Sequence, residues 1–274
     1  MAKKQPKLVV PKAASPDALA LADQLLEIAP GDLQAALVLH GASRYAQAIF
    51  FLQQGVEKIG KAYGLAMGLA EPAELQKDWS HNTLKHSEVF ADYGEQQGLT
   101  STGMAPDKVK AFIEELKNPD KVTGAMMAFL VEWAVSLVQQ HDAYKKDPNQ
   151  RARGLSEMTT WAVGTHTDPA AVAKATALAE YLVDFSAESS LILPTTVVLG
   201  IATAPHAVIS RYPAGGVSPA KRYGAEYPVV VALPKLCLIA EALASSVRVL
   251  CELAPRLQPI LAMPGGDVSA DEKH

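Results

Sequence analysis

Residues 32–63, DLQAALVLHGASRYAQAIFFLQQGVEKIGKAY, decide the fold class. Apolar side chains recur in this stretch at intervals of three and four residues, the spacing of one face of an α-helix. They are Leu39, Ala42, Ala46, Ile49, Val56, Ile59 and Tyr63. Asp32 can cap this helix at its start. Gly55, Gly60 and Gly64 lower helix propensity, so we expect them to let a neighbouring helix approach closely or to introduce a kink.

Caps and helix breakers predict further helices on both sides of this one. Ser15-Pro16-Asp17 starts a helix that reaches about residue 28, and Pro30-Gly31 should break it. Residues 210–227 are rich in Gly, Pro, Tyr and Arg, which predicts an irregular segment. Only residues 195–198 suit a strand, so the sequence predicts an all-α helical bundle. The other expected helices span about residues 80–93, 106–116, 122–144, 155–163, 170–185 and 229–253.

Composition favours a cytoplasmic protein with a sizeable core, because 49% of the 274 residues are hydrophobic. Cys237 and Cys251 lie in apolar stretches, which predicts reduced core thiols rather than a disulfide. The most apolar run, residues 191–204, is shorter than the roughly 20 residues that cross a bilayer, so we expect a core helix and no membrane contact. The apolar stretch of a secretory signal is missing after the basic N-terminus. The net charge of −4 argues against strong DNA binding.

Several short segments resemble the HEPN superfamily of helical domains, and most closely its abortive-infection V group. They are residues 44–50 (RYAQAIF), 53–62 (QQGVEKIGKA) and 80–85 (SHNTLK), followed far downstream by residues 210–213 (SRYP). The resemblance implies a bundle that often dimerises and acts in prokaryotic defence or toxin-related systems. Members are metal-independent ribonucleases or noncatalytic binding partners.

The resemblance covers about residues 32–93 and 206–253, and it implies a layout for the whole chain. Residues 15–104 would form HEPN-like helices, residues 105–190 inserted or second-layer helices, and residues 191–260 the closing helices of the bundle. Residues 1–14 and 261–274 would be flexible tails. The polar stretch 145–153 is the clearest internal boundary between layers.

Active HEPN families carry an arginine, four to six intervening residues and a histidine. No arginine stands at that spacing before His81 or His86, which favours a noncatalytic protein- or RNA-binding module. The alternative is a metal-independent endoribonuclease at the interface of a homodimer. His81 and His86 would serve as acid and base, and Lys85 would stabilise phosphate charge. Capping or surface roles for the two histidines remain the plainer interpretation.

Two groups of basic residues are candidates for contact with RNA or a protein partner. Arg44, Lys58 and Lys61 could form a strip along the long helix, or they could be ordinary surface charge. Glu57 can pair with Lys61 on what we expect to be the exposed side of that helix. The second group mixes Arg211, Lys221 and Arg222 with tyrosines, which suits phosphate contacts and base stacking or, as we favour, a tyrosine-anchored turn. Those tyrosines are Tyr212, Tyr223 and Tyr227.

We expect neither a metal site nor a bound cofactor. His40, His141 and His206 have no metal-ligand spacing, and the Walker A, GxGxxG and HExxH motifs are missing. Thr167-Asp168-Pro169 is explained as a helix cap rather than as part of a site with His166. A third class of function, a helical enzyme of unrelated chemistry, would have its pocket in the apolar second half, between Leu155 and Pro213.

Overall fold

The structure is a computed structural model that describes residues 14–75, 122–164 and 167–264. These residues form seven α-helices and one 3-10 turn and contain no strand, which confirms the all-α prediction. Residues 195–198 lie within a helix. The elements are α1 (Pro16–Gly41), α2 (Tyr45–Ala66), α5 (Gly124–Lys146), α6 (Pro148–Val163), α7 (Pro169–Thr203), η2 (Ala204–His206), α8 (Pro219–Arg222) and α9 (Pro228–Ala262).

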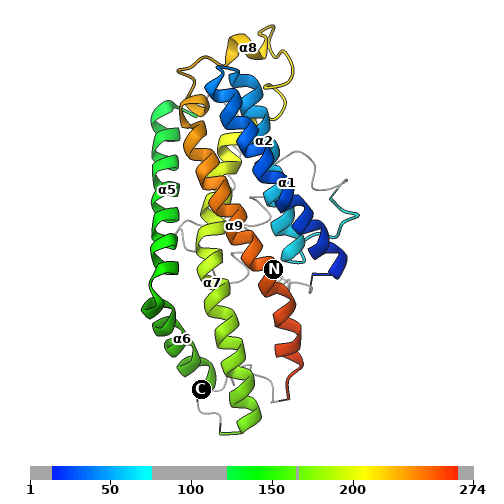
Figure 1. Cartoon of the computed structure of the whole chain (residues 1–274), viewed down its shortest axis with the longest axis vertical. Helices are drawn as coiled ribbons and strands as arrows, with labels where there is room; N and C mark the ends of the chain where they lie inside the picture. Colours follow the sequence, from blue (N-terminus) through cyan, green and yellow to red (C-terminus); the bar gives the residue numbers. More distant parts are fainter. Residues whose placement is uncertain (1–13, 76–121, 165–166, 265–274) are drawn as a thin grey trace, which may run out of the picture.

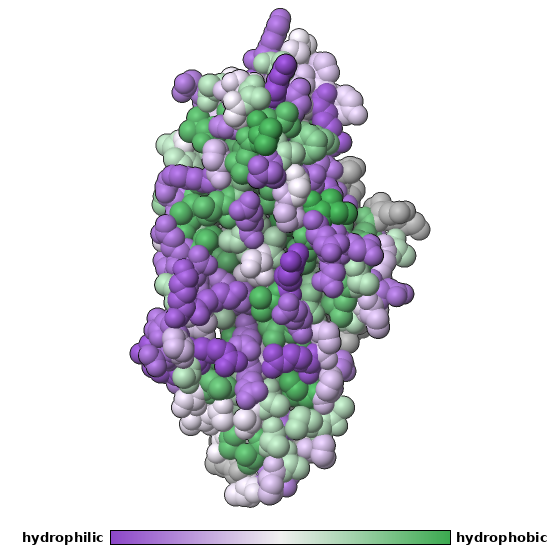
Figure 2. Space-filling view, viewed as in Figure 1, coloured by the Kyte–Doolittle hydropathy of each residue, from purple (hydrophilic) through white to green (hydrophobic). Residues whose placement is uncertain are grey.

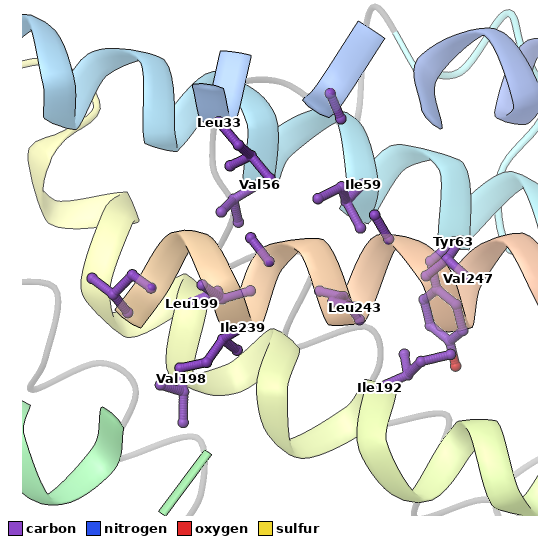
Figure 3. Close-up of a cluster of buried hydrophobic side chains, with 14 of the residues drawn as sticks. Leu33, Val56, Ile59, Tyr63, Ile192, Val198, Leu199, Ile239, Leu243 and Val247 are labelled. Atoms are coloured by element: carbon purple, nitrogen blue, oxygen red, sulfur yellow. The ribbon is translucent and has the colours of Figure 1, made fainter. Parts of the chain in front are cut away.

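Helix α9 is the central element, because it packs against α1, α2, α5 and α7 (Figure 1). Figure 3 shows the core between these helices, with Leu33 from α1, Ile59 from α2, Leu199 from α7 and Leu243 from α9. All four side chains are at most 1% exposed. Burial of each such side chain contributes about 1.5–3 kcal/mol, so the shared core explains why the long helices form one bundle.

Proline has a smaller effect on α1 than the sequence suggested, and the predicted break at Pro30-Gly31 is wrong. Helix α1 continues through Pro30 to Gly41. Pro30 has no N–H to donate to the Leu26 carbonyl, but Arg248 of α9 donates to that oxygen at 3.3 Å. Asp32 therefore lies inside the helix and does not cap it. The break comes later, next to Ser43, which has a φ of 56°.

The same compensation recurs at Pro234, near the start of α9. Proline at this position leaves the Val230 carbonyl without its intrahelical donor. The His40 Nε2 atom lies 3.0 Å from that oxygen, so its N–H can donate the missing hydrogen bond. Helix α9 also continues past Pro255 and Pro259, and α7 past Pro194, so both helices are longer than predicted.

Two local predictions are confirmed in atomic detail. A Cβ atom added to Gly55 of α2 would lie 2.7 Å from Leu33 Cδ2 of α1, so the missing side chain lets these helices approach closely. Ser15 accepts a hydrogen bond from Ala18 N, and Asp168 accepts bonds from Ala170 N and Ala171 N, as helix caps do.

Cys237 and Cys251 are buried, unpaired thiols. Burial raises the pKa of each to about 12, so both are protonated at neutral pH.

Two helical stretches, Pro169–His206 and Pro228–Ala262, are long and apolar enough to cross a membrane by length and composition alone. Within their most apolar windows, 61% and 56% of the residues are buried inside the bundle. Core helices of soluble proteins pass the same test, so this pair is weak evidence for a membrane protein. Cytoplasmic location stays a prediction.

Candidate functional site

A shallow pocket of about 500 Å³ lies between the start of α2 and the turn that leads into α8. Phe50 of α2 lines one wall, and Arg211, Tyr212 and Pro219 line the other. Arg44, which is exposed, precedes the pocket residue Ala46 by two positions. We call Arg44, Phe50, Arg211, Tyr212 and Arg222 the bundle-end surface. Figure 2 shows hydrophilic side chains projecting from the end of the molecule where α8 lies in Figure 1.

Arg211 is held in a defined position on this surface. Its Nε donates to the Ala207 carbonyl at 2.9 Å, and its guanidinium carbon lies 5.2 Å from the centroid of the Phe50 ring. This cation–π contact leaves the edge of the guanidinium free for other acceptors. Tyr212, the next residue, is 61% exposed. An arginine and an accessible aromatic ring therefore lie next to each other.

The turn behind these residues is anchored by a buried aromatic cluster. Nδ1 of His206 and the Tyr223 hydroxyl share a hydrogen bond of 3.0 Å, and the Tyr227 ring packs edge-on against both side chains. Burial, assisted by the positive charge of Arg222, lowers the pKa of His206 to about 4. Burial also raises the pKa of Tyr223. Tyr223 and Tyr227 thus act as the tyrosine-anchored interpretation predicts, whereas Tyr212 is free to contact a ligand.

The bundle-end surface has a local positive charge. Between residues 204 and 227 the chain carries Arg211, Lys221 and Arg222 against a single acid, Glu226. Arg222 is half-buried and donates to the Ala214 carbonyl at 3.3 Å, whereas Lys221 is exposed. The structure therefore brings Arg44, Arg211, Tyr212 and Arg222 to one end of the bundle.

Lys58 and Lys61 are not part of that surface. They follow Arg44 by fourteen and seventeen residues along α2, which is roughly 21–26 Å. Lys58 pairs with Asp32 at 2.5 Å, and Lys61 pairs with Glu57 at 2.6 Å. Glu57 is only 5% exposed and also accepts a hydrogen bond from Gln53, so our expectation of an exposed Glu57–Lys61 pair is wrong. The three basic residues do not form a continuous strip.

The proposed acid–base residues His81, Lys85 and His86 lie outside the described residues. The three described histidines each have a partner within the bundle. His40 contacts the Val230 carbonyl, His206 is buried against Tyr223, and His141 faces Glu188. Within residues 14–75, 122–164 and 167–264, no group of three or more His, Cys, Asp or Glu side chains could hold a metal ion.

The sequence analysis missed a buried ionic network. Glu188 of α7 is 4% exposed; its Oε2 lies 3.1 Å from His141 Nε2 and its Oε1 lies 2.9 Å from Lys145 Nζ. Burial acts to raise the pKa of Glu188, but His141, Ser246 and Lys145 together outweigh it and lower that pKa. Two signals were present in the sequence: His141 and Lys145 are spaced i,i+4, and Glu188 precedes a long apolar run.

No protein-family model, curated protein or solved structure matches this chain. The HEPN resemblance therefore rests on the sequence motifs alone.

Proposed function

We propose that the protein is an HEPN-like, noncatalytic binding module of a prokaryotic defence or toxin-related system, and that its bundle-end surface binds RNA. The observation that carries the proposal is the placement of Arg211 over Phe50 beside the exposed ring of Tyr212. An arginine contacts phosphate oxygens, and an accessible aromatic ring stacks on an unpaired base. Arg44 and Arg222 extend the positive charge along the same end.

The anchoring of this surface supports binding by a preformed site. Arg211 is fixed by Ala207 and Phe50, and the turn is held from behind by His206 and Tyr223. A ligand would therefore order few side chains when it binds, which reduces the entropic cost of association. Because the whole chain carries a charge of −4, we expect modest, strongly salt-dependent affinity for a single-stranded RNA.

Two observations favour binding without cleavage. No arginine precedes His81 or His86 at the spacing of active HEPN enzymes. Two described histidines lie at this end of the bundle: His206 is buried with a pKa near 4, and His40 is half-buried with its Nε2 on the Val230 carbonyl. A histidine that stays neutral and enclosed is poorly suited to exchange protons with a substrate at neutral pH.

The proposal is tested with a labelled mixed RNA pool in EDTA, followed by both mobility shift and cleavage. We expect the wild-type protein to shift the RNA without cutting it, and Tyr212→Ala to weaken the shift. Cleavage that disappears in a His81→Ala, His86→Ala double variant would instead establish the alternative, a metal-independent ribonuclease. Absence of any shift at low salt would contradict RNA binding and direct the search to a protein partner.

We also expect a homodimer, because the HEPN resemblance implies one. Sedimentation equilibrium measures this directly, and a mass of 29.1 kDa at micromolar concentration would contradict the expectation.

A further inference from the structure

A cleft of about 930 Å³ lies between α5, α6 and α7, well away from the bundle-end surface. Its volume is in the range of sites for small organic molecules, about 300–1,000 Å³. The lining is mainly apolar, with Leu137 from α5, Met158 from α6, and Leu182 and Leu191 from α7. Trp161 also lines the cleft and is 72% exposed, an unusual position for so large an apolar ring.

One wall of the cleft carries a carboxylate that forms no ion pair with the described residues. This residue, Glu157, lines the cleft and is exposed. It precedes Trp161 by four positions on α6, so the carboxylate and the indole lie on the same helix face. Two cations near the cleft are already paired, Lys145 with Glu188 and Arg151 with Asp184. Arg153, four positions before Glu157 on α6, is exposed and does not line the cleft. A carboxylate next to an exposed indole attracts a cation both by charge and through the face of the ring.

The floor of the cleft offers a polar group for orientation. His141 lines the cleft and is only 8% exposed, and its Nε2 faces Glu188. None of the described hydrogen bonds uses its Nδ1. A buried polar side chain with a free ring nitrogen at the edge of an apolar cleft can fix the orientation of a bound molecule.

We propose that this cleft binds an amphipathic organic cation, an amine with an aromatic or aliphatic body. The ammonium group lies between the Glu157 carboxylate and the Trp161 ring, and the apolar body packs on Leu137, Leu182 and Leu191. A polar substituent on that body reaches His141. This site is separate from the RNA-binding surface, so either proposal can fail without affecting the other.

The test compares three probes that share one body and differ in the head group: 4-phenylbutylamine, 4-phenylbutanol and 4-phenylbutanoate. Isothermal titration calorimetry on the full chain should show the amine binding about tenfold more tightly than the alcohol, and the acid more weakly still. Glu157→Gln should remove most of the advantage of the amine over the alcohol and leave the alcohol affinity unchanged. Trp161→Leu should weaken the amine more than the alcohol.

Glu241→Gln is the matched control, because it removes the same charge from an exposed position on α9 outside the cleft. It should leave the amine affinity unchanged. Circular dichroism checks that each variant keeps its helices. We expect Glu157→Gln and Glu241→Gln to keep them, because both change an exposed glutamate to another good helix former. Equal affinity for the amine and the alcohol, an unaltered amine affinity in Glu157→Gln, or no binding of any probe would overturn the proposal.

Discussion

The Arg248 guanidinium of α9 donates a hydrogen bond of 3.3 Å to the Leu26 carbonyl of α1, the oxygen that Pro30 leaves without an intrahelical donor. A proline in a helix interior ordinarily costs about 3 kcal/mol, part of it because such a carbonyl loses its partner. Here a side chain from another helix supplies the bond, so α1 stays continuous and can pack along both α2 and α9.

This relationship predicts a coupling between positions 30 and 248. Arg248→Met should lower the free energy of unfolding by about 1–2 kcal/mol, because it leaves the Leu26 carbonyl without a donor. In a Pro30→Ala background the new backbone N–H bonds that carbonyl, so the same change should cost about 1 kcal/mol less. Urea unfolding of the four proteins measures the coupling, and strictly additive effects would contradict this account of Pro30.

A matched pair of glycine substitutions tests the packing of α1 on α2. Gly55→Ala should destabilise the protein by about 1–2 kcal/mol although alanine favours helix, because the new Cβ would lie 2.7 Å from the fully buried Leu33. Gly31→Ala should stabilise it by about 0.5–1 kcal/mol, since nothing lies within 4 Å of that Cβ. Thermal unfolding compares the two, and shifts of the same sign would contradict the predicted difference in packing.

The buried His206 predicts a pH dependence of stability. Its pKa is about 4 in the folded protein against 6.5 for an unperturbed histidine, so between these values the unfolded chain binds the extra proton. The contribution of neutral His206 to the free energy of unfolding is therefore fully present above pH 6.5 and is lost as the pH falls towards 4. His206→Gln cannot take up that proton, so the wild type should lose about 2 kcal/mol more than the variant between pH 7 and pH 4.5. Parallel losses in urea unfolding would contradict this assignment.

The Glu188 network predicts an unequal response to two glutamate substitutions on α7. Glu188→Gln should cost about 2–3 kcal/mol, because it leaves the buried His141 and the half-exposed Lys145 without their carboxylate. Glu180→Gln, at an exposed position, should change stability by less than about 0.5 kcal/mol. Because the pKa of Glu188 is lowered by folding, its contribution is present above pH 4.5 and falls as the carboxylate is protonated. Equal costs at pH 7 would contradict the network.

Local rules predicted the parts of the fold that depend on neighbouring residues. The caps at Ser15 and Asp168 and the close approach at Gly55 follow from helix chemistry alone. The break at Pro30 was mispredicted because Arg248, which replaces the lost bond, comes from α9, far along the chain. No local pattern reveals such a partner.

The candidate sites show the same limit. The sequence placed Arg211 beside Tyr212, but the contact of Arg211 with Phe50 depends on how α2 packs at the end of the bundle. The i,i+4 rule predicted the Glu57–Lys61 pair, whereas the burial of Glu57 depends on tertiary packing. Glu157 and Trp161 share a helix face by spacing alone, and only the placement of α5 and α7 opposite them creates a cleft.

The central claim, that the bundle-end surface binds RNA, is tested most directly by the salt dependence of affinity for a fluorescently labelled single-stranded RNA. Anisotropy titrations should show the logarithm of affinity falling linearly with the logarithm of salt concentration. Arg44→Gln should reduce the slope by about 0.7, the share of one phosphate contact, whereas Lys146→Gln, exposed at the end of α5, should leave it unchanged. An identical slope in the wild type and Arg44→Gln, or no binding at low salt, would contradict the claim.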